Sequence, residues 1–260
     1  MLPFDPDRIV HHALMNVLAP IWEEMFIRDS YSCIKGRGQH AASRRAMEFV
    51  RRNKYALKCD IRKFYPSISH DIMFDIVKKS VTDERMLGIL RDIIHSVQGG
   101  KNVPIGNLCS QWFGNLYLHE LDMFVKQSLR CKCYLRYSDD FCLFHNDKEK
   151  LKEWRRRIDE FIHARLGLSF SKSEIFPVGN GLDFVGYRHF KDFILIRKRT
   201  LKRMKKRMLR IGKMNKIPEC KIENARGSVA AANGWFKHAC SYNLRKKLKF
   251  KKLKRMVGIE

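Results

Sequence analysis

The sequence has no apolar run that approaches the roughly 20 residues of a membrane-spanning helix. Its N-terminus, MLPFDPDRIVHHAL, also lacks the charged start and apolar middle of a signal peptide. These two absences argue against a membrane protein and against secretion. They predict a cytoplasmic or nucleoid-associated protein.

Acidic residues are scarce, with 27 Asp and Glu against 53 Lys and Arg and a formal net charge of +26 at pH 7. Solubility alone does not require such a charge, so a polyanionic partner is expected. Nucleic acid is the default candidate, and an anionic membrane surface is the rival. The hydrophobic content of 45% over 260 residues is ample for the packed core of one large domain or two modest ones.

Pairs of cysteines with zinc-binding spacing are also missing. Of the eight cysteines, Cys59, Cys109 and Cys142 stand singly in apolar stretches, where a thiol behaves as a small hydrophobe. Cys131 and Cys133 are close together, but a lone CxC without a second pair gives weak support for zinc. The cysteines are therefore expected to be reduced residues of the core.

Apolar residues recur at helical spacing from Arg8 to Phe26, which predicts an amphipathic helix interrupted near Pro20. Further helices are predicted at 41–52, 70–81 with Ser69 as N-cap, 109–127 and 148–165, and strands at 55–61, 168–171 and in two hairpins at 134–144 and 181–198. These elements do not alternate as βαβ units, and no internal repeat is evident. The pattern predicts an α+β fold with a largely antiparallel sheet.

The composition changes at about Arg197, where basic segments with apolar residues at helical intervals begin. They predict a separate, basic, helical C-terminal domain. The alternative is a solvated charged face or a disordered tail. The aromatic residues of AANGWFKHACSY, which need burial, favour the folded domain.

Three acids stand out against the basic background. Asp139 and Asp140 lie between two short apolar runs in YLRYSDDFCLF, and Asp60 ends the predicted strand YALKCDI. Two carboxylates about 4 Å apart repel by about 4 kcal/mol at an effective dielectric of 20, and an isolated Asp pair is more often a polar turn. If the two strands are neighbours, with Asp139 in register opposite Asp60, the acids converge and can ligate Mg²⁺ for phosphoryl transfer.

The context of these acids resembles one enzyme family. YSDD in a hairpin resembles the YxDD signature of reverse transcriptases, and CDIRKFYPSISH resembles their first catalytic motif. GLSFSKSEI and DFVGYRHF resemble the later lysine motif and the primer-grip hairpin, in the family's order, and FDPDRIVHHAL resembles the run entering the fingers of group II intron and retroelement enzymes. The resemblance implies a right-hand RNA-directed DNA polymerase with partial fingers (1–56), a palm with remaining fingers elements (57–196) and a basic helical thumb (197–260).

Carried over to this sequence, the resemblance implies a catalytic set of Asp60, Asp139, Asp140 and Lys172, and a site for two Mg²⁺ ions, with Mn²⁺ as an alternative, at Asp60, Ile61, Asp139 and Asp140. Asp60 and Asp139 would be the principal ligands, with Asp140 bound less directly, and Lys172 would donate a proton near the leaving phosphate. The implied nucleotide-binding residues are Arg37, Tyr65, Ile105, Gly106 and Gln111, and the implied primer grip is Phe184, Gly186 and Tyr187.

Three of these assignments have a simpler alternative. Tyr65 falls where the family places an aromatic steric gate, which leaves no room for a 2′-hydroxyl, but it could also be a core aromatic beside Phe64. Lys172 could be one more exposed lysine. Arg37 stands between glycines whose backbone can approach phosphate, but a solvated loop arginine is the alternative.

The stretch PIGNLCSQWFGNLYLHELD bears on the subtype. Its Ile105-Gly106 and Ser110-Gln111 resemble the IG and SQ form of diversity-generating retroelement enzymes, where group II intron and retron enzymes typically carry QG and SP, and GWFKHACSY is similar to that family's thumb. The implied activity is error-prone copying of a template RNA into cDNA, with misincorporation opposite adenine. The implied partners are an RNA template, a DNA or RNA primer, dNTPs and a small basic accessory protein.

Other functions remain open on the sequence. The chain begins almost at LPFDPDRIV, where related enzymes carry further fingers strands, so the fingers are expected to be incomplete. A non-polymerising RNA-binding ribonucleoprotein component with a degenerate polymerase fold is therefore one alternative, and a defence-associated reverse transcriptase is another. An RNA-dependent RNA polymerase also carries paired palm aspartates, although Tyr65 and the SQ motif argue for dNTPs.

Overall fold

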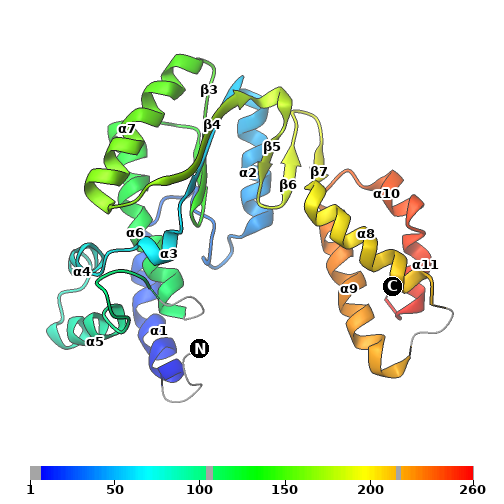
Figure 1. Ribbon diagram of the computed structural model, residues 1–260, viewed down its shortest axis with the longest axis horizontal. Helices are drawn as coiled ribbons and strands as arrows, with labels where there is room; N and C mark the ends of the chain where they lie inside the picture. The colour runs from blue at the N-terminus through cyan, green and yellow to red at the C-terminus, as the bar shows by residue number, and fades with distance from the viewer. Residues whose placement is uncertain (1–6, 104–107, 215–217, 260) are drawn as a thin grey trace. The chain divides into compact units, whose positions relative to one another are not determined.

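The computed structural model describes residues 7–103, 108–214 and 218–259 (Figure 1). The chain forms two compact units that divide between Pro177 and Val178, and each is described by itself. This division lies before residues 196 and 197, where the palm was predicted to meet the thumb. The assignment of fingers, palm and thumb to the predicted ranges stays a prediction.

Seven α-helices are described in the first unit: α1 (Asp7–Met25), α2 (Gln39–Arg52), α3 (Phe64–Ser67), α4 (His70–Lys78), α5 (Glu84–Ile94), α6 (Leu108–Met123) and α7 (Lys148–Leu166). A π-helical turn, Phe124–Ser128, continues α6. Five of these helices follow the predicted ranges within a few residues at most ends. Ser69 takes the N-cap position of α4 as predicted, although its side chain makes no capping hydrogen bond.

The first unit contains a four-stranded sheet of β1 (Tyr55–Ile61), β2 (Tyr134–Tyr137), β3 (Asp140–His145) and β4 (Phe170–Pro177). The strand order is β2-β3-β1-β4, and every neighbouring pair is antiparallel. The strands that carry the candidate acids are therefore direct neighbours. The predicted α+β class with an antiparallel sheet is confirmed.

Helices cover both faces of the sheet. Successive side chains of a strand point to opposite faces, so neighbouring residues of one strand contact different helices. Phe144 of β3 packs against Phe49 of α2, with ring centroids 5.5 Å apart. The next residue, His145, packs against Trp154 of α7 at 5.3 Å. Figure 1 accordingly shows α2 and α7 on opposite faces of the sheet. Leu57 and Cys59 of β1 belong to the large core cluster of this unit.

Helix α1 runs without interruption through Pro20, contrary to the break predicted there. Proline removes one backbone hydrogen bond, and tertiary packing offsets that loss here. Trp22 and Phe26 follow the proline and pack against Phe113 and Trp112 of α6, with ring centroids 6.2 and 6.1 Å apart. This packing holds the turn after Pro20 in the helical conformation.

Two strand predictions were wrong in extent. The strand predicted at 168–171 is β4, which begins at Phe170 and runs to Pro177. Most of its side chains are only partly buried or exposed, as is common on an edge strand, so its apolar pattern is weak. The segment 181–198 was predicted as a single hairpin but forms three antiparallel strands, β5 (Leu182–Phe184), β6 (Tyr187–His189) and β7 (Ile194–Ile196), because residues 185 and 186 already turn the chain.

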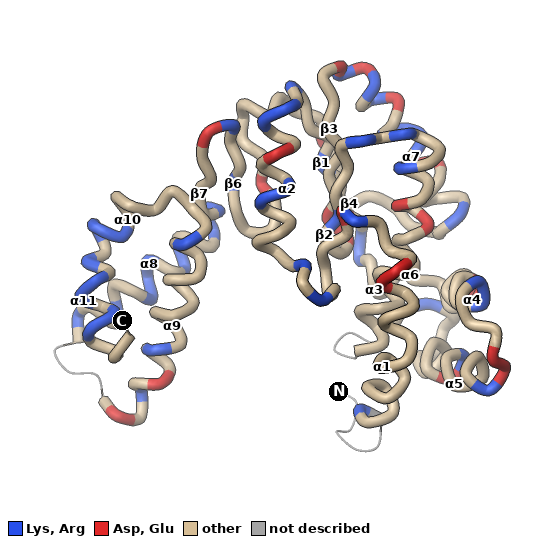
Figure 2. The backbone as a smooth tube through the Cα atoms, turned by 180° about the vertical axis from the view of Figure 1, so that it is seen from behind, with Lys and Arg blue, Asp and Glu red and all other residues tan. Residues whose placement is uncertain are grey.

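The second unit adds α8 (Lys198–Gly212), α9 (Glu219–Lys237), α10 (Tyr242–Lys247) and α11 (Phe250–Met256) to these three strands. The helices bury one apolar cluster, which includes Met204, Met208, Ile211, Val229, Phe236, Phe250 and Leu253. Lys and Arg recur along α8, α10 and α11 (Figure 2). The basic segment is thus folded, which excludes the disordered tail, although Tyr242 is 78% exposed and does not need the burial expected of it.

Candidate active site

The three acids lie at one end of the sheet, but their register differs from the prediction. Asp60 of β1 pairs with Asp140 of β3, whereas the sequence analysis placed Asp139 opposite Asp60. Tyr137 pairs with Asp140, so Ser138 and Asp139 form the two-residue turn between β2 and β3. Ser138 has a φ of 56°, the positive value that a tight hairpin turn needs at its first position. Asp139 is therefore presented at the tip of the hairpin, next to the Asp60–Asp140 pair.

Lys58 is a member of this group that the sequence analysis missed. It lies two residues before Asp60 and so on the same face of β1, and its Nζ is 3.0 Å from Oδ2 of Asp140. The alternation in YALKCDI was the available signal, because Leu57, Cys59 and Ile61 are fully or nearly buried while Lys58 and Asp60 are not. The pairing gives Asp140 a cation within the protein.

Burial is the main cause of the raised pKa values of Asp139 and Asp140. It raises the pKa of Asp140 to about 6, with Asp60 and Asp139 adding to the rise and Lys58 opposing it. Burial likewise raises the pKa of Asp139, and the nearby charge of Asp60 adds to the effect, while bonds from the backbone and Ser138 oppose it. Oδ1 of Asp140 is buried and has no hydrogen-bond partner. One oxygen of the Asp140 carboxylate is thus left without a partner from the described residues of the protein.

Asp60 is held from the β4 side. The hydroxyl of Ser171 donates to the carboxylate of Asp60 and lies 3.2 Å from its main-chain carbonyl oxygen. The pairing of β1 with β4 shifts register between Asp60 and Ile61, a bulge of the kind that re-aims side chains near active sites. The Ile61 side chain is 2% exposed and apolar, so only its main-chain carbonyl could serve a metal.

These residues fit a hard divalent cation by donor chemistry. Carboxylate and carbonyl oxygens are the ligands that Mg²⁺ takes. The unpartnered oxygen of Asp140 could bind a metal ion without breaking a hydrogen bond. As they stand in 7–103, 108–214 and 218–259, however, no three His, Cys, Asp or Glu side chains are grouped to hold a metal. Asp60 is engaged by Ser171 and Asp140 by Lys58. The acids fit the ion as donors, but they are not grouped around a shared centre.

A buried polar network fixes the hairpin from the opposite face of the sheet. Arg136 of β2 is fully buried and donates from Nε and Nη2 to the two carboxylate oxygens of Asp122, at 2.8 and 2.7 Å. Its Nη1 donates to Asn115 Oδ1 at 3.1 Å and to the main-chain oxygen of Ser138 at 3.2 Å. Tyr134 donates to the same Asp122 at 2.6 Å. This network, also missed from the sequence, ties helix α6 to the turn that carries Asp139.

Tyr65 is brought to the same turn. Its ring lies beside Phe64, with centroids 5.2 Å apart, and its hydroxyl is close enough to Ser138 and Asp139 for both side chains to affect its pKa. Partial burial raises the pKa of this phenol. Tyr65 is thus neither a fully buried core residue nor remote from the acids.

The other predicted nucleotide-binding residues have mixed placements. Nη1 of Arg37 donates to the main-chain oxygens of Ile27 and Ser30, at 2.8 and 3.1 Å, which gives this side chain a part in holding the loop after α1. Gln111 is exposed on α6. Ile105 and Gly106 lie outside the described residues. The nucleotide-binding roles of all four stay predictions.

Lys172 lies directly opposite Asp60 on β4, so the structure brings its backbone to the acids. Its Nζ is 3.1 Å from Glu174 Oε2, and both side chains are more than half exposed. An exposed pair of this kind binds weakly and leaves the lysine able to turn toward another anion. Its role as a proton donor stays a prediction.

The predicted primer-grip residues belong to the second unit. Phe184 and Tyr187 are fully buried and pair at the ends of β5 and β6. The turn between them has positive φ at both positions, 43° at Val185 and 83° at Gly186. Tyr187 packs on Trp235 of α9, with ring centroids 4.8 Å apart. The turn is thus shaped against helix α9, while its contact with a primer stays a prediction.

Gly186→Ala is expected to destabilise the second unit by about 2–4 kcal/mol, as overpacking combined with a left-handed backbone does. A Cβ at this position would lie 2.4 Å from Cη2 of Trp235. The matched control is Gly234→Ala in α9, where a Cβ meets nothing within 4 Å. Hydrogen exchange of α8 and α9 amides measures the difference, and equal protection in the two variants would contradict the expected clash.

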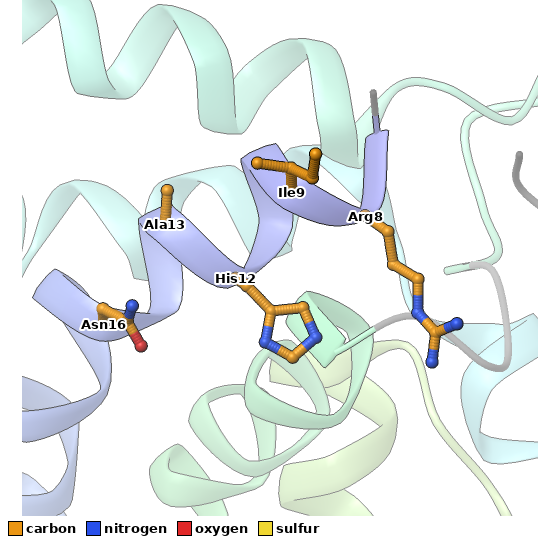
Figure 3. Close-up of a pocket in the computed structure, with 5 residues that line it drawn as sticks. All are labelled: Arg8, Ile9, His12, Ala13 and Asn16. Atoms are coloured by element: carbon orange, nitrogen blue, oxygen red, sulfur yellow. The ribbon is translucent and has the colours of Figure 1, made fainter. Parts of the chain in front are cut away.

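Two hollows lie outside this group of acids. One runs along α1 and is lined by Arg8, Ile9, His12, Ala13 and Asn16, with none of the predicted site residues among them (Figure 3). The other lies between α8 and α9 in the second unit, with Arg203, Lys206, Arg207 and Arg210 at its basic wall and Met204, Ala232 and Trp235 among its apolar lining. The second hollow has the charge that a phosphate backbone requires.

Among the described residues, no helix is long and apolar enough to cross a membrane. The cysteines at 59, 109 and 142 are free and buried as predicted, and burial raises the pKa of Cys59 and Cys109 to about 12. Cys131 is buried too, and its thiol donates a hydrogen bond to the main-chain oxygen of Cys133. The prediction of core cysteines is wrong for Cys33, Cys220 and Cys240, which are exposed.

The antiparallel sheet places Asp60 of β1 beside Asp140 of β3, with Asp139 next to them in the β2–β3 turn. This arrangement defines a palm-type polymerase domain. A sequence model described as "Reverse transcriptase (RNA-dependent DNA polymerase)" matches residues 2–189. The chain belongs to this family, which confirms the predicted enzyme class of RNA-directed DNA polymerase.

Relatives and solved structures agree with this assignment. The chain is 24% identical to Protein YkfC of Escherichia coli over 88% of this chain and 69% of that protein. It is 20% identical to the group II intron-encoded protein LtrA of Lactococcus lactis over 66% of this chain and 30% of that protein. Telomerase of Candida tropicalis, solved with a fragment of telomeric RNA, superposes with a TM-score of 0.58 at 13% identity, over 87% of this chain and 41% of that one. The chain thus spans less than half of LtrA and of the telomerase, and the latter likeness concerns the fold alone.

Proposed function

We propose that the chain copies an RNA template into cDNA by metal-dependent nucleotidyl transfer at Asp60, Asp139 and Asp140. The observation that supports this proposal most directly is the register of β1 and β3, which brings the acids of two separate motifs to one end of the sheet. The charge of Asp60, which adds to the raised pKa of Asp139 and of Asp140, and the unpartnered oxygen of Asp140 support a site that favours a cation. Two Mg²⁺ ions, or Mn²⁺ in their place, would be held by these carboxylates and the carbonyl of Ile61.

When bound, the ions would help to deprotonate the primer 3′-hydroxyl and neutralise the leaving pyrophosphate. The chain's own residues do the positioning. Ser171 orients Asp60, and Arg136 holds the turn of Asp139 through the Ser138 carbonyl. Tyr65, at that same turn, would lie beneath the sugar and exclude a 2′-hydroxyl. Lys172 would give a proton to the pyrophosphate.

The second unit would hold the template-primer duplex. The basic wall of the α8–α9 hollow supplies guanidinium and ammonium groups for phosphate contacts, and the net charge of +26 favours a polyanion. Contacts to phosphate position a duplex without reading its sequence. Choice of template would then lie with RNA structure or with a partner, for which a small basic accessory protein is the proposed candidate.

Primer extension tests this function. Full-length protein is given a structured RNA template, an annealed DNA primer and dNTPs, with and without a small basic partner, in Mg²⁺ or in EDTA. We expect extension that needs Mg²⁺ and dNTPs and is not supported by NTPs. RNA binding without any extension would favour the non-polymerising ribonucleoprotein component, and equal use of NTPs would favour an RNA polymerase.

We further propose the diversity-generating subtype, on the strength of Ile105-Gly106 and Ser110-Gln111. An apolar residue at 105 removes a hydrogen bond that glutamine could make to the incoming nucleotide, and such a loss weakens discrimination by about 1–3 kcal/mol. A defence-associated enzyme is the competing subtype.

Ile105→Gln is therefore expected to lower misincorporation opposite template adenine by about tenfold, the equivalent of 1.4 kcal/mol. Sequencing of cDNA made on a fixed RNA template measures the error at each base. Ile105→Leu is the matched control, since it stays apolar and should keep the error spectrum. If Ile105→Gln leaves the adenine errors unchanged, this explanation of the subtype is wrong.

A further inference from the structure

Helix α6 carries a glycine in its interior, at position 114, that the backbone does not require. Gly114 has no positive φ, and a glycine inside a helix is destabilising relative to alanine. Space explains it instead. A Cβ at 114 would lie 3.1 Å from Cε1 of Phe64, 3.1 Å from Cε1 of Tyr65 and 3.4 Å from the Tyr65 hydroxyl.

Other helical glycines lack this crowding. A Cβ at Gly88 of α5 or at Gly234 of α9 would meet nothing within 4 Å. Close approach of two aromatic rings to the helix backbone is thus a particular feature of position 114. It depends on the missing side chain.

Of the two rings, Tyr65 is the one that can move. Phe64 is 3% exposed and is packed against Tyr117 of α6, with ring centroids 6.4 Å apart. Tyr65 is only partly buried, and its phenol is close enough to Ser138 and Asp139 for both to affect its pKa. The Cε1 edge of the Tyr65 ring therefore lies close to the backbone of Gly114, while part of the Tyr65 side chain stays exposed.

We propose that Gly114 is a positioning residue that sets how deeply the Tyr65 ring sits, and thereby how much room the nucleotide sugar has. This inference rests on the proposed function, in which Tyr65 excludes the 2′-hydroxyl. A methyl group at 114 displaces the ring by a few tenths of an ångström away from α6. Because the sugar would lie against the exposed part of this ring, the displacement would make the space for the sugar smaller.

The direction of the change in nucleotide preference distinguishes Gly114→Ala from truncation of the Tyr65 ring. Tyr65→Val enlarges the space and admits ribonucleotides. Gly114→Ala makes the space smaller, so the deoxynucleotide is bound less well and the ribonucleotide is excluded more strongly. A structural weakening of α6 would instead lower incorporation of both nucleotides by the same factor.

Steady-state incorporation of a single dGTP or GTP by full-length protein tests this, with Gly88→Ala as the matched helical control. For Gly114→Ala we expect the KM for dGTP to rise about tenfold with kcat within about twofold, and the preference for dGTP over GTP to rise at least about threefold. Gly88→Ala should leave all three quantities at wild-type values. An unchanged or lowered preference in Gly114→Ala would overturn the proposal.

A double-mutant cycle isolates the contact. In a Tyr65→Val background there is no ring to displace, so Gly114→Ala should have no further effect on the KM or on the preference. If the full effect persists there, Gly114 does not act through Tyr65. Should Gly114→Ala alone fail to fold, the Tyr65→Val/Gly114→Ala variant is expected to regain a cooperative melting transition, although the contact with Phe64 remains. Failure to regain that transition also overturns the proposal.

A readout without catalysis separates this inference from the proposed function. With 3-fluorotyrosine at position 65, the ¹⁹F resonance should shift in Gly114→Ala and stay in place in Gly88→Ala. A protein that never extends a primer yet shows this shift would keep the positioning role and lose the polymerase function. A wild-type resonance in Gly114→Ala would remove the positioning role alone.

Discussion

Asp139→Asn is expected to lower primer extension by about three orders of magnitude or more, because removal of a metal-holding charge forfeits several kcal/mol of transition-state stabilisation. Asp139 sits at the tip of the β2–β3 hairpin, beside the Asp60–Asp140 pair. Amide in place of carboxylate keeps the size of the side chain and removes its charge. Single-turnover extension of a primer on RNA, in Mg²⁺ with saturating dNTP, measures the loss.

The same series ranks the three acids. Asp60→Asn should match Asp139→Asn, since each would supply a principal ligand. Asp140→Asn should cost less, because the Asp140 carboxylate is already paired with Lys58 at 3.0 Å. The control is Asp92→Asn, an exposed acid of α5 that should leave extension unchanged. Equal, small losses for all three acids would contradict a metal site at this end of the sheet.

RNA binding distinguishes lost catalysis from lost folding. Removing one negative charge from a chain of net charge +26 does not weaken attraction for a polyanion. Each aspartate variant should therefore bind the template-primer duplex at least as tightly as wild type. Weaker binding by Asp139→Asn would mean that the hairpin had changed shape, and the loss of extension would then say nothing about metal.

Apolar periodicity and turn-forming residues in the sequence were sufficient to predict most of the helices and strands. The helices over 39–52 and 148–166 have strong apolar periodicity, and their ends were predicted to within two residues. Alternation placed β1 correctly, whereas the pairing of β1 with β3 was only a condition of the predicted site until the structure showed it. Errors arose where local pattern and tertiary packing disagree. Pro20 predicts a break that packing of Trp22 on Phe113 overrides.

The candidate site was predictable only as far as its residue types. Asp60, Asp139 and Asp140 could be named from the motifs that resemble reverse transcriptases, but their register could not, because a one-residue shift of a hairpin changes every cross-strand pair. The true register makes Asp140, rather than Asp139, the partner of Asp60. Lys58 and Ser171 were missed because each becomes a neighbour of an acid only once the strands pair.

Arg136→Met is expected to lower the free energy of unfolding of the first unit by about 3–5 kcal/mol, the usual cost of breaking a buried ion pair. Arg136 and Asp122 are both fully buried, so the methionine leaves an uncompensated carboxylate in the core. The matched control is Arg156→Met. Arg156 pairs with Glu160 one turn away on the surface of α7, and loss of this exposed pair should cost about 0.3–0.5 kcal/mol. Hydrogen exchange of β1 and β3 amides reports this unit separately from the second.

A double variant separates the two roles of Arg136. In Arg136→Met/Asp122→Leu the buried charge is gone, so most of the lost stability should return, less the cost of leaving the Tyr134 hydroxyl without its acceptor. The Ser138 carbonyl still lacks the donor that Arg136 supplied at 3.2 Å, so the turn of Asp139 is less firmly held. Extension should then stay about 10–100-fold below wild type although the protein is folded, as for other supports of metal ligands. Full activity in this stable variant would show that Arg136 serves the fold alone, and that the hairpin holds Asp139 in place without it.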